Sequence, residues 1–356
     1  GLGDVYKRQP SFRLGSAQTT KRVRIQDLIC ACTGLPRKDF NFIFATTLQT
    51  PASTTFEQLA ATEPTSKFGE VFQYNNLMAS AAGYIAGHLV YPDRELGAAY
   101  DAAMQAKIFD PLGMNDTTFD MKRALAANHA SPHGNDVDGH TAVASAAINY
   151  IVVPYRPAGG AWSSAHDFIK YAQDEVTPGV SPDGKRIISA TNVLKRRQHT
   201  VPVGEDEYYG MGLMENVRYG VSVIHHGGDL IGFHSDFIAI PSAGVAAVIL
   251  TNSDNGVYLR GPFMRRLLEV LYEGKPEAAA DVAAIAVNVK AELAKARQRL
   301  VVPAAPAVVS TLASHYDNSE LGHIDVRKDG SGVVFDFGLW KSHVCLLYTS
   351  PSPRDR

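Results

Sequence analysis

Three polar residues, Tyr74, Asn75 and Asn76, stand directly before a segment in which apolar residues recur at helical spacing. A tyrosine hydroxyl can donate or accept a proton, and an asparagine amide can bind a carbonyl group. Capping the helix needs only one asparagine, because its side-chain oxygen accepts a backbone N–H of the first turn. Capping alone therefore leaves Tyr74 and the second asparagine unexplained. The structural alternative is a capped helix with a packed tyrosine.

A second polar group, His225-His226-Gly-Gly-Asp229, lies in the most strand-like part of the sequence. Together with His234 these histidines could indicate a metal site. Alternating residues on adjacent strands need not converge, however, and no carboxylate–histidine pattern typical of zinc accompanies them. We therefore predict that the protein binds no metal.

Helices are predicted to carry the first of these groups. Helical patterns cover residues 24–29, 54–61, 75–88 and 96–109, and a further helix starts after Ser164. Thr54 with Glu57 and Ser164 with Asp167 fit capping boxes. Asn75 is free to cap the helix that follows Tyr74.

Strands are predicted to carry the second group. Short β-rich runs cover residues 221–224, 234–240 and 245–250, and they are separated by HHGG, PSAG and NSDNG. This alternation predicts an antiparallel meander, with another helix over residues 262–272. Helices first, then consecutive strands, then a helix indicate an α+β fold in which helices cover an antiparallel sheet beside a helical region.

The composition changes after Gly274. An alanine-rich charged helix over residues 278–300 leads to the linker-like segment VVPAAPAVV, and turn signals follow at residues 329–332. We expect residues 10–274 to form one domain and residues 275–302 a helical linker. Residues 303–344 should begin a small C-terminal β domain.

The overall composition excludes few functions. The chain has 356 residues, of which 45% are hydrophobic and 20% charged, and its net charge is −2. That charge gives no reason to expect a nucleic-acid partner, and no run of about 18 apolar residues predicts a membrane span. Cys30 and Cys32 are too close in sequence for an ordinary disulfide, so we interpret them as small buried apolar residues.

The two ends of the chain differ from the rest. GLGDVYKRQ opens the sequence, and CLLYTSPSP begins at Cys345. A back-translation of the first string has a reverse complement that encodes the second in another frame. We therefore expect residues 1–9 and 345–356 to be adapter-derived, and the natural protein to be truncated at both ends.

Six segments in order resemble the serine β-lactamase and penicillin-binding-protein-like hydrolases, the group of class C β-lactamases, D-alanyl-D-alanine peptidases and esterases. These segments are DLICACTGLPRKD, FGEVFQYNN, DPLGMNDTTF, PAGGAWSSAHDFIKY, YYGMGL and HHGGDLIGFHSDFIAIP. They cover about residues 20–256. The resemblance implies a class C β-lactamase-like or DD-peptidase-like fold that is incomplete here, and acyl transfer without a cofactor. It also implies a small ester, amide or peptide substrate and a periplasmic or secreted location.

The resemblance assigns roles to both polar groups. Tyr74 would share the proton of a nucleophilic serine with a lysine, and Asn76 would hold that lysine and the substrate carbonyl. His226, Gly227 and Gly228 would replace the family's K-T-G strand. The amide N–H of Asp229 would then be a candidate oxyanion donor.

The sequence departs from the family pattern in two places. Histidine is mostly neutral at pH 7, so His226 weakens the fixed cation for a substrate carboxylate and favours an esterase or peptidase over a true β-lactamase. The S-x-x-K motif, which supplies the serine and the lysine, does not occur in the chain. We expect an inactive fragment of a serine acyl hydrolase. The alternative is a non-catalytic binding protein that kept the fold.

Overall fold

Six antiparallel strands form the central sheet, in the order β3-β4-β5-β6-β7-β8. A computed structural model of the chain describes residues 3–5, 12–329 and 332–347. The strands are β3 Val201–Pro202, β4 Glu207–Tyr209, β5 Met214–Asn216, β6 Val223–Leu230, β7 Phe233–Ile240 and β8 Val245–Thr251. Each pairs with its sequence neighbour, which confirms the predicted meander.

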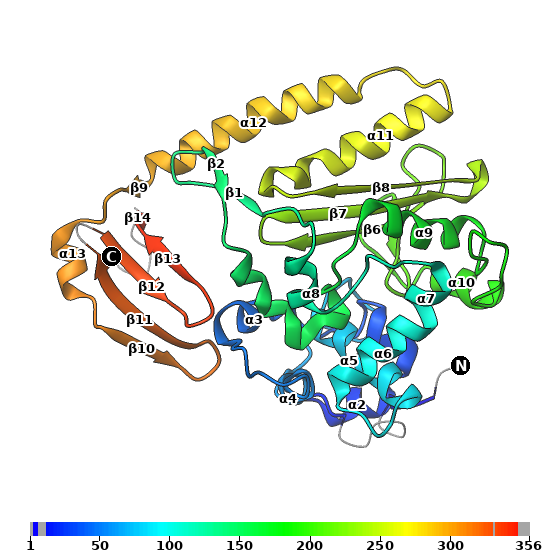
Figure 1. The fold of residues 1–356 in the computed structure, drawn as a ribbon, viewed down its shortest axis with the longest axis horizontal. Coiled ribbons are helices and arrows are strands. Elements are labelled where there is room, and N and C mark those ends of the chain that lie inside the picture. The colour runs from blue at the N-terminus through cyan, green and yellow to red at the C-terminus, as the bar shows by residue number, and fades with distance from the viewer. Residues whose placement is uncertain (1–2, 6–11, 330–331, 348–356) are drawn as a thin grey trace.

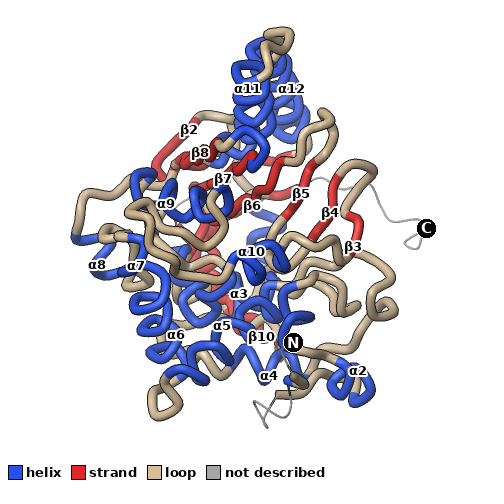
Figure 2. The backbone as a smooth tube through the Cα atoms, turned by 90° about the vertical axis from the view of Figure 1, so that its right-hand side faces the viewer, coloured by secondary structure: helices blue, strands red, loops and turns tan. Residues whose placement is uncertain are grey.

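Alternating side chains of this sheet pack against helices on its two faces. Ile224, Phe237 and Ala239 contact residues of α9 (Ala165–Val176) on one face. Val223, Ile238 and Ile240 contact residues of α11 (Arg260–Leu271) on the other. Figure 2 shows the sheet between the α11–α12 pair and the helical region. Both faces are therefore buried, as in the predicted α+β architecture.

The helical region is built around α5, whose buried face joins the largest apolar cluster. Its elements are α2 Ala17–Arg22, η1 Ile25–Ile29, α3 Asp39–Ala45, α4 Thr54–Ala60, α5 Asn76–Val90, α6 Leu96–Met104, η2 Gln105–Phe109, α7 Asp110–Leu112, α8 Met121–Ala126, β1 His133–Asn135, β2 Thr141–Val143 and η3 Ala146–Ala158. The remaining helices near the sheet are α10 Ala190–Arg196, η4 Pro241–Ala243 and η5 Asp254–Leu259. Among the described residues, no helix combines the length and hydrophobicity needed to cross a membrane.

The C-terminal part forms a separate four-stranded sheet in the order β10-β11-β12-β13, drawn orange to red in Figure 1 beside α3. Its elements are α12 Ala278–Gln298, β9 Leu300–Val301, α13 Pro306–Thr311, β10 His315–Asn318, β11 Gly322–Asp329, β12 Gly332–Asp336, β13 Lys341–Val344 and β14 Leu346–Leu347. The predicted hairpin is present as the β11–β12 pair. Its turn residues Gly330 and Ser331 lie outside the described residues.

The predicted division into domains stays a prediction. Residues 1–2, 6–9 and 348–356 of the two adapter-like stretches lie outside the described residues. Within the described part, Val5 is buried in the largest apolar cluster, and β14 pairs with β9.

Three local predictions need correction. The HHGG sequence does not end a strand, because β6 continues through it to Leu230. Thr54 lies inside α4 rather than capping it, and Ser53 occupies the N-cap position. Cys30 and Cys32 are buried as predicted, yet they form a disulfide. Ala31 between them has a φ of 51°, and this left-handed turn brings their Cα atoms to 5.1 Å.

Ser164 caps α9 as predicted, because its Oγ accepts the N–H of Asp167 at 3.1 Å. The Asp167 carboxylate does not complete the capping box. It accepts instead from the N–H of Asp116 at 2.7 Å and from Lys170 at 3.0 Å. Burial alone would raise the pKa of Asp167, but these hydrogen bonds lower it.

Candidate active site

Asn75 fixes the start of α5. Its Oδ1 accepts the N–H of Met78 at 2.9 Å, and its Nδ2 donates to the carbonyl of Pro36 at 2.7 Å. The side chain is buried. One asparagine therefore does the capping, as predicted, and it also ties the helix to the segment before α3.

Asn76 points toward α3. Its Nδ2 lies 3.1 Å from Oδ1 and 3.2 Å from Oδ2 of Asp39, and this carboxylate also pairs with Arg37. The donor side of the Asn76 amide is therefore occupied. Among the described residues, no hydrogen bond reaches its Oδ1.

Tyr74 and His226, which the sequence placed in one site, do come together. Their ring centroids lie 6.1 Å apart, and Tyr209 completes the group at 6.2 Å from Tyr74 and 5.8 Å from His226. Tyr74 and Tyr209 line a small cavity of about 40 Å³ together with Met78. His226 adjoins Tyr209 but is not among the residues that line this cavity.

Two hydrogen bonds determine the tautomer of His226. Its Nδ1 lies 2.8 Å from the carbonyl oxygen of Gly227, which can only accept, so Nδ1 carries the proton. Nε2 then accepts from the hydroxyl of Tyr209 at 3.1 Å. Burial lowers the pKa of His226. The ring is therefore neutral, and both of its nitrogens are occupied by protein groups.

Burial also raises the pKa of Tyr74. The guanidinium of Arg37, whose Cζ lies 5.4 Å from the centroid of the Tyr74 ring, acts in the opposite direction. Tyr74 is therefore a protonated phenol at neutral pH, and Arg37 is the cation that would best stabilise its phenolate.

The strand beside this group has an open edge. β5 pairs with β6 only at Val223, Ile224 and His225, so the edge from His226 to Leu230 has no partner strand on that side among the described residues. A Cβ at Gly227 would lie 2.8 Å from Nη1 of Arg260, and one at Gly228 would lie 2.6 Å from Oγ of Ser235. A larger residue at either position would therefore have to displace the end of one of these side chains.

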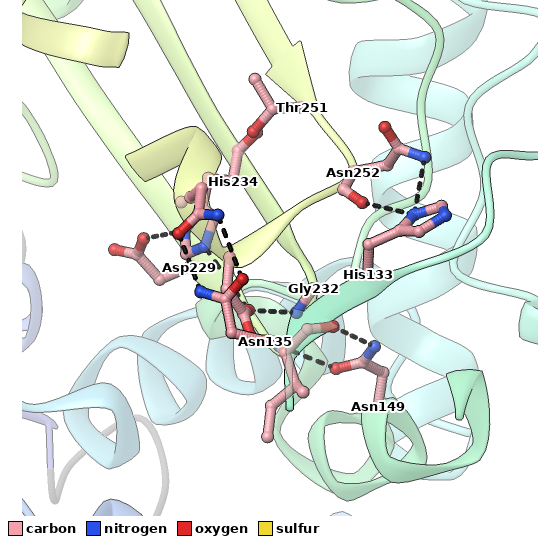
Figure 3. Close-up of polar contacts among 12 residues, drawn as sticks. His133, Asn135, Asn149, Asp229, Gly232, His234, Thr251 and Asn252 are labelled. Carbon is pink, nitrogen blue, oxygen red and sulfur yellow. Dashed lines mark hydrogen bonds and ion pairs between the residues drawn. The ribbon is translucent and has the colours of Figure 1, made fainter. Parts of the chain in front are cut away.

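The tip of the β6–β7 hairpin is held by side chains from two other elements (Figure 3). The amide of Asn149 on η3 donates to the carbonyl of Ile231 at 2.9 Å and accepts its N–H at 3.1 Å. Asp254 accepts the N–H of Gly232 at 2.7 Å. This clamp fixes the position of the strand that carries Asp229.

Asp229 has its own partners at the same edge. Its carboxylate pairs with Arg260 at 2.5 Å and with Nδ1 of His234 at 2.6 Å. Burial alone would raise its pKa, but these two partners lower it. The Asp229 carboxylate is therefore ionised and engaged by Arg260 and His234. The backbone N–H of Asp229 remains the candidate hydrogen-bond donor to an oxyanion.

His225 lies on the opposite face of the sheet from His226. Glu207 lies 3.1 Å from its Nε2, and Asp236 lies 3.5 Å from its Nδ1. Burial would lower the pKa of His225, yet the two carboxylates raise it to about 9. The two histidines thus do not converge, and in the described part of the chain no group of three or more His, Cys, Asp or Glu residues is arranged to hold a metal ion.

Three residues of the site were not predicted with a role, and Tyr209, the third ring of the group, is one of them. Arg37 belongs to the quoted segment DLICACTGLPRKD, but nothing in that segment shows that its side chain reaches Tyr74. Asn149 contacts the hairpin tip across 82 residues of sequence and has no local signal. Trp162 packs edge-on against Phe233 at 5.5 Å.

The family model described as beta-lactamase matches residues 6–270. Among curated proteins, the chain is 28% identical over 258 residues to the unguisins hydrolase ungD' of Aspergillus campestris, covering 68% of this chain and 45% of that protein. It is 25% identical over 177 residues to penicillin-binding protein 4 of Amycolatopsis lactamdurans, covering 48% and 46%. The chain thus spans about half the length of these relatives.

Solved structures share the fold. The octameric penicillin-binding protein homologue from Pyrococcus abyssi has a TM-score of 0.63 at 18% identity, over 97% of this chain and 73% of that one. The D-amino acid amidase from Ochrobactrum anthropi complexed with L-phenylalanine amide has a TM-score of 0.56 at 18% identity, over 71% and 69%. The first match extends over the C-terminal sheet as well.

Proposed function

The chain belongs to the beta-lactamase family, and we propose that it is part of a serine acyl hydrolase that cleaves an ester, amide or peptide bond through an acyl-enzyme. This proposal rests on one observation: the rings of Tyr74, Tyr209 and His226 lie close together beside the open edge of β6. A substrate can lie along that edge because no strand pairs with residues 226–230 on that side within the described part of the chain. The hydrolases and amidase among the similar proteins support the same reaction class.

In this proposal Tyr74 is the general acid–base group. Tyr74 must lose its proton before it can act as a base, and burial makes its phenolate less stable. The positive charge of Arg37 offsets part of this destabilisation as the phenolate forms. Asn76 can still contribute its Oδ1, which would accept a hydrogen bond from a lysine ammonium. The backbone N–H of Asp229 would donate to the developing oxyanion.

The nucleophile is the component that these 356 residues do not provide, because no S-x-x-K occurs in them. We propose that the chain alone is catalytically inactive. A serine-reactive fluorophosphonate probe should therefore not label the chain, and the chain should not hydrolyse p-nitrophenyl esters. A product of the parent gene that carries S-x-x-K should be labelled and should hydrolyse the ester without sensitivity to chelators.

Tyr74→Phe in that active product tests the assignment directly. Loss of a general acid–base group typically lowers kcat by about 10² to 10⁴. The melting temperature should change little, because the substitution keeps the ring and its packing. A loss of stability with unchanged kcat would instead assign Tyr74 a packing role.

The absence of S-x-x-K also favours a second candidate, a binding protein that kept the fold without the chemistry. A single measurement distinguishes the two candidate functions. A parent gene product that binds acyl amino acids but neither turns them over nor reacts with the probe would support the binding protein.

A further inference from the structure

Substrate carboxylates need a cation, and β6 does not supply a free one. Both ring nitrogens of His226 are occupied by Gly227 and Tyr209, and the ring is neutral. The guanidinium of Arg260 pairs with Asp229 and donates to the carbonyl of Gly228. Neither residue presents an unpaired charge along the open edge.

Arg37 presents a cation near the Tyr74 ring. Its Cζ lies 5.4 Å from the centroid of that ring, and its side chain is 60% exposed. Asp39 accepts from Nε of Arg37. Among the described residues, no hydrogen bond involves the two terminal NH₂ groups, so part of the planar fork that binds carboxylates is open.

Arg37 also lines a groove, and Tyr74 is not among the residues that line it. The groove has a volume of about 470 Å³, which lies within the usual range of about 300–1,000 Å³ for ligand sites. Arg37, Lys38, Phe40 and Asn41 form one wall, and residues 318–321 of the β10–β11 turn form the other. Phe40 is 68% exposed there.

The second wall is firmly attached. Asn41 donates to the carbonyl of Glu320 at 2.9 Å, and the indole N–H of Trp340 donates to the carbonyl of Ile43 at 2.7 Å. The Phe44 ring lies 5.8 Å from that of Trp340. Lys38 and Glu320 face each other at 4.0 Å, so the charge of Lys38 is only weakly compensated.

We propose that Arg37, assisted by Lys38, is the carboxylate-binding residue of this site, and that the groove between α3 and the β10–β11 turn holds an acyl amino acid or short peptide by its free carboxylate. This inference rests on the proposed function, since it assumes that the bond to be cleaved lies beside Tyr74. The C-terminal sheet then shapes the substrate site. The exposed Phe40 ring gives an apolar contact for the neighbouring acyl group.

The test compares two matched ligands, hippurate and hippuramide, which differ only in a carboxylate and a neutral amide. NMR titration of the 356-residue chain at low salt should show hippurate binding roughly fivefold more tightly, the upper range for an exposed ion pair. Added salt should reduce this preference because exposed charges are screened. Arg37→Gln should remove most of it, and Arg37→Lys should restore part of it.

Arg94→Gln is the matched control, since the Arg94 guanidinium also lies over an aromatic ring, that of Tyr91, at 4.6 Å but lines no part of the groove. It should leave the preference unchanged. Equal affinity for the two ligands, a preference that survives Arg37→Gln, or no binding of either ligand would each overturn the proposal. Because binding is measured without turnover, a failed hydrolase assay with an intact carboxylate preference would refute the proposed function alone.

Discussion

Asn149→Ala should destabilise the protein by removing the clamp on the β6–β7 hairpin. Asn149 is 1% exposed, and its amide makes both hydrogen bonds to Ile231. Each lost bond leaves a backbone group without a partner, which costs about 1–3 kcal/mol when water cannot replace it. Ile231 is partly exposed, so the lower half of that range applies to each bond. With two bonds lost at about 1–2 kcal/mol each, the free energy of unfolding should fall by about 2–4 kcal/mol.

Urea denaturation measures this change, and the slope with denaturant should stay constant if only stability is altered. Asn135→Ala is the control, because Asn135 bonds the side chain of Asn255 at a partly exposed position and should cost about 0.5–1 kcal/mol. Hydrogen exchange should accelerate at the hairpin tip and not in the centre of β7. Equal destabilisation by the two variants would refute the role of Asn149 as a clamp.

Two further predictions concern the histidines of β6. The pKa of His225 is raised to about 9 from its usual 6.5, so its contribution to stability is fully present below pH 6.5 and is lost as the pH rises through 9. Melting temperatures between pH 6 and 10 should show this loss in the wild type and much less of it in His225→Gln; parallel curves would contradict it. In ¹⁵N NMR, His226 should carry its proton on Nδ1. A wild-type proton on Nε2 would refute the assignment.

The proximity of Tyr74 and His226 was predictable because the motifs occur in the same order as in a family whose fold brings the two positions together. Tyr74 lies before α5 and His226 in β6, and the resemblance required both at one site. The capping role of Asn75 was predictable for a different reason. A helix start leaves backbone N–H groups without partners, and the residue that satisfies them is adjacent in sequence.

The continuation of β6 through HHGG could not be predicted from local propensity. Glycine weakens an isolated strand, and the sequence therefore predicted a break. In the structure, Gly227 pairs with Asp236 and Gly228 with Ser235 of β7. Tertiary pairing overrides the propensity, and the side chains of Arg260 and Ser235 fill the space that a larger residue would need.

The partners of Asn76 and Asn149 could not be predicted either, because they lie 37 and 82 residues away. No period or motif links such distant residues. The disulfide between Cys30 and Cys32 was missed for a local reason. Two residues apart, side chains share one face of an extended strand but are normally too far apart for a disulfide. Here Ala31 between the cysteines is left-handed, and their Cα atoms lie 5.1 Å apart.

The arrangement of charges explains why a neutral histidine is compatible with the K-T-G position. A lysine there would lie among Tyr209, Tyr74 and the buried backbone of β6, where its charge would have to be desolvated. His226 avoids that cost because it stays neutral and keeps both nitrogens hydrogen-bonded. The cation can then reside on Arg37, at an exposed position where Asp39 engages Nε and the two terminal NH₂ groups remain available to a substrate carboxylate. The substrate would thus be held from the side of the C-terminal sheet, while β6 retains an uncharged edge for the reacting carbonyl.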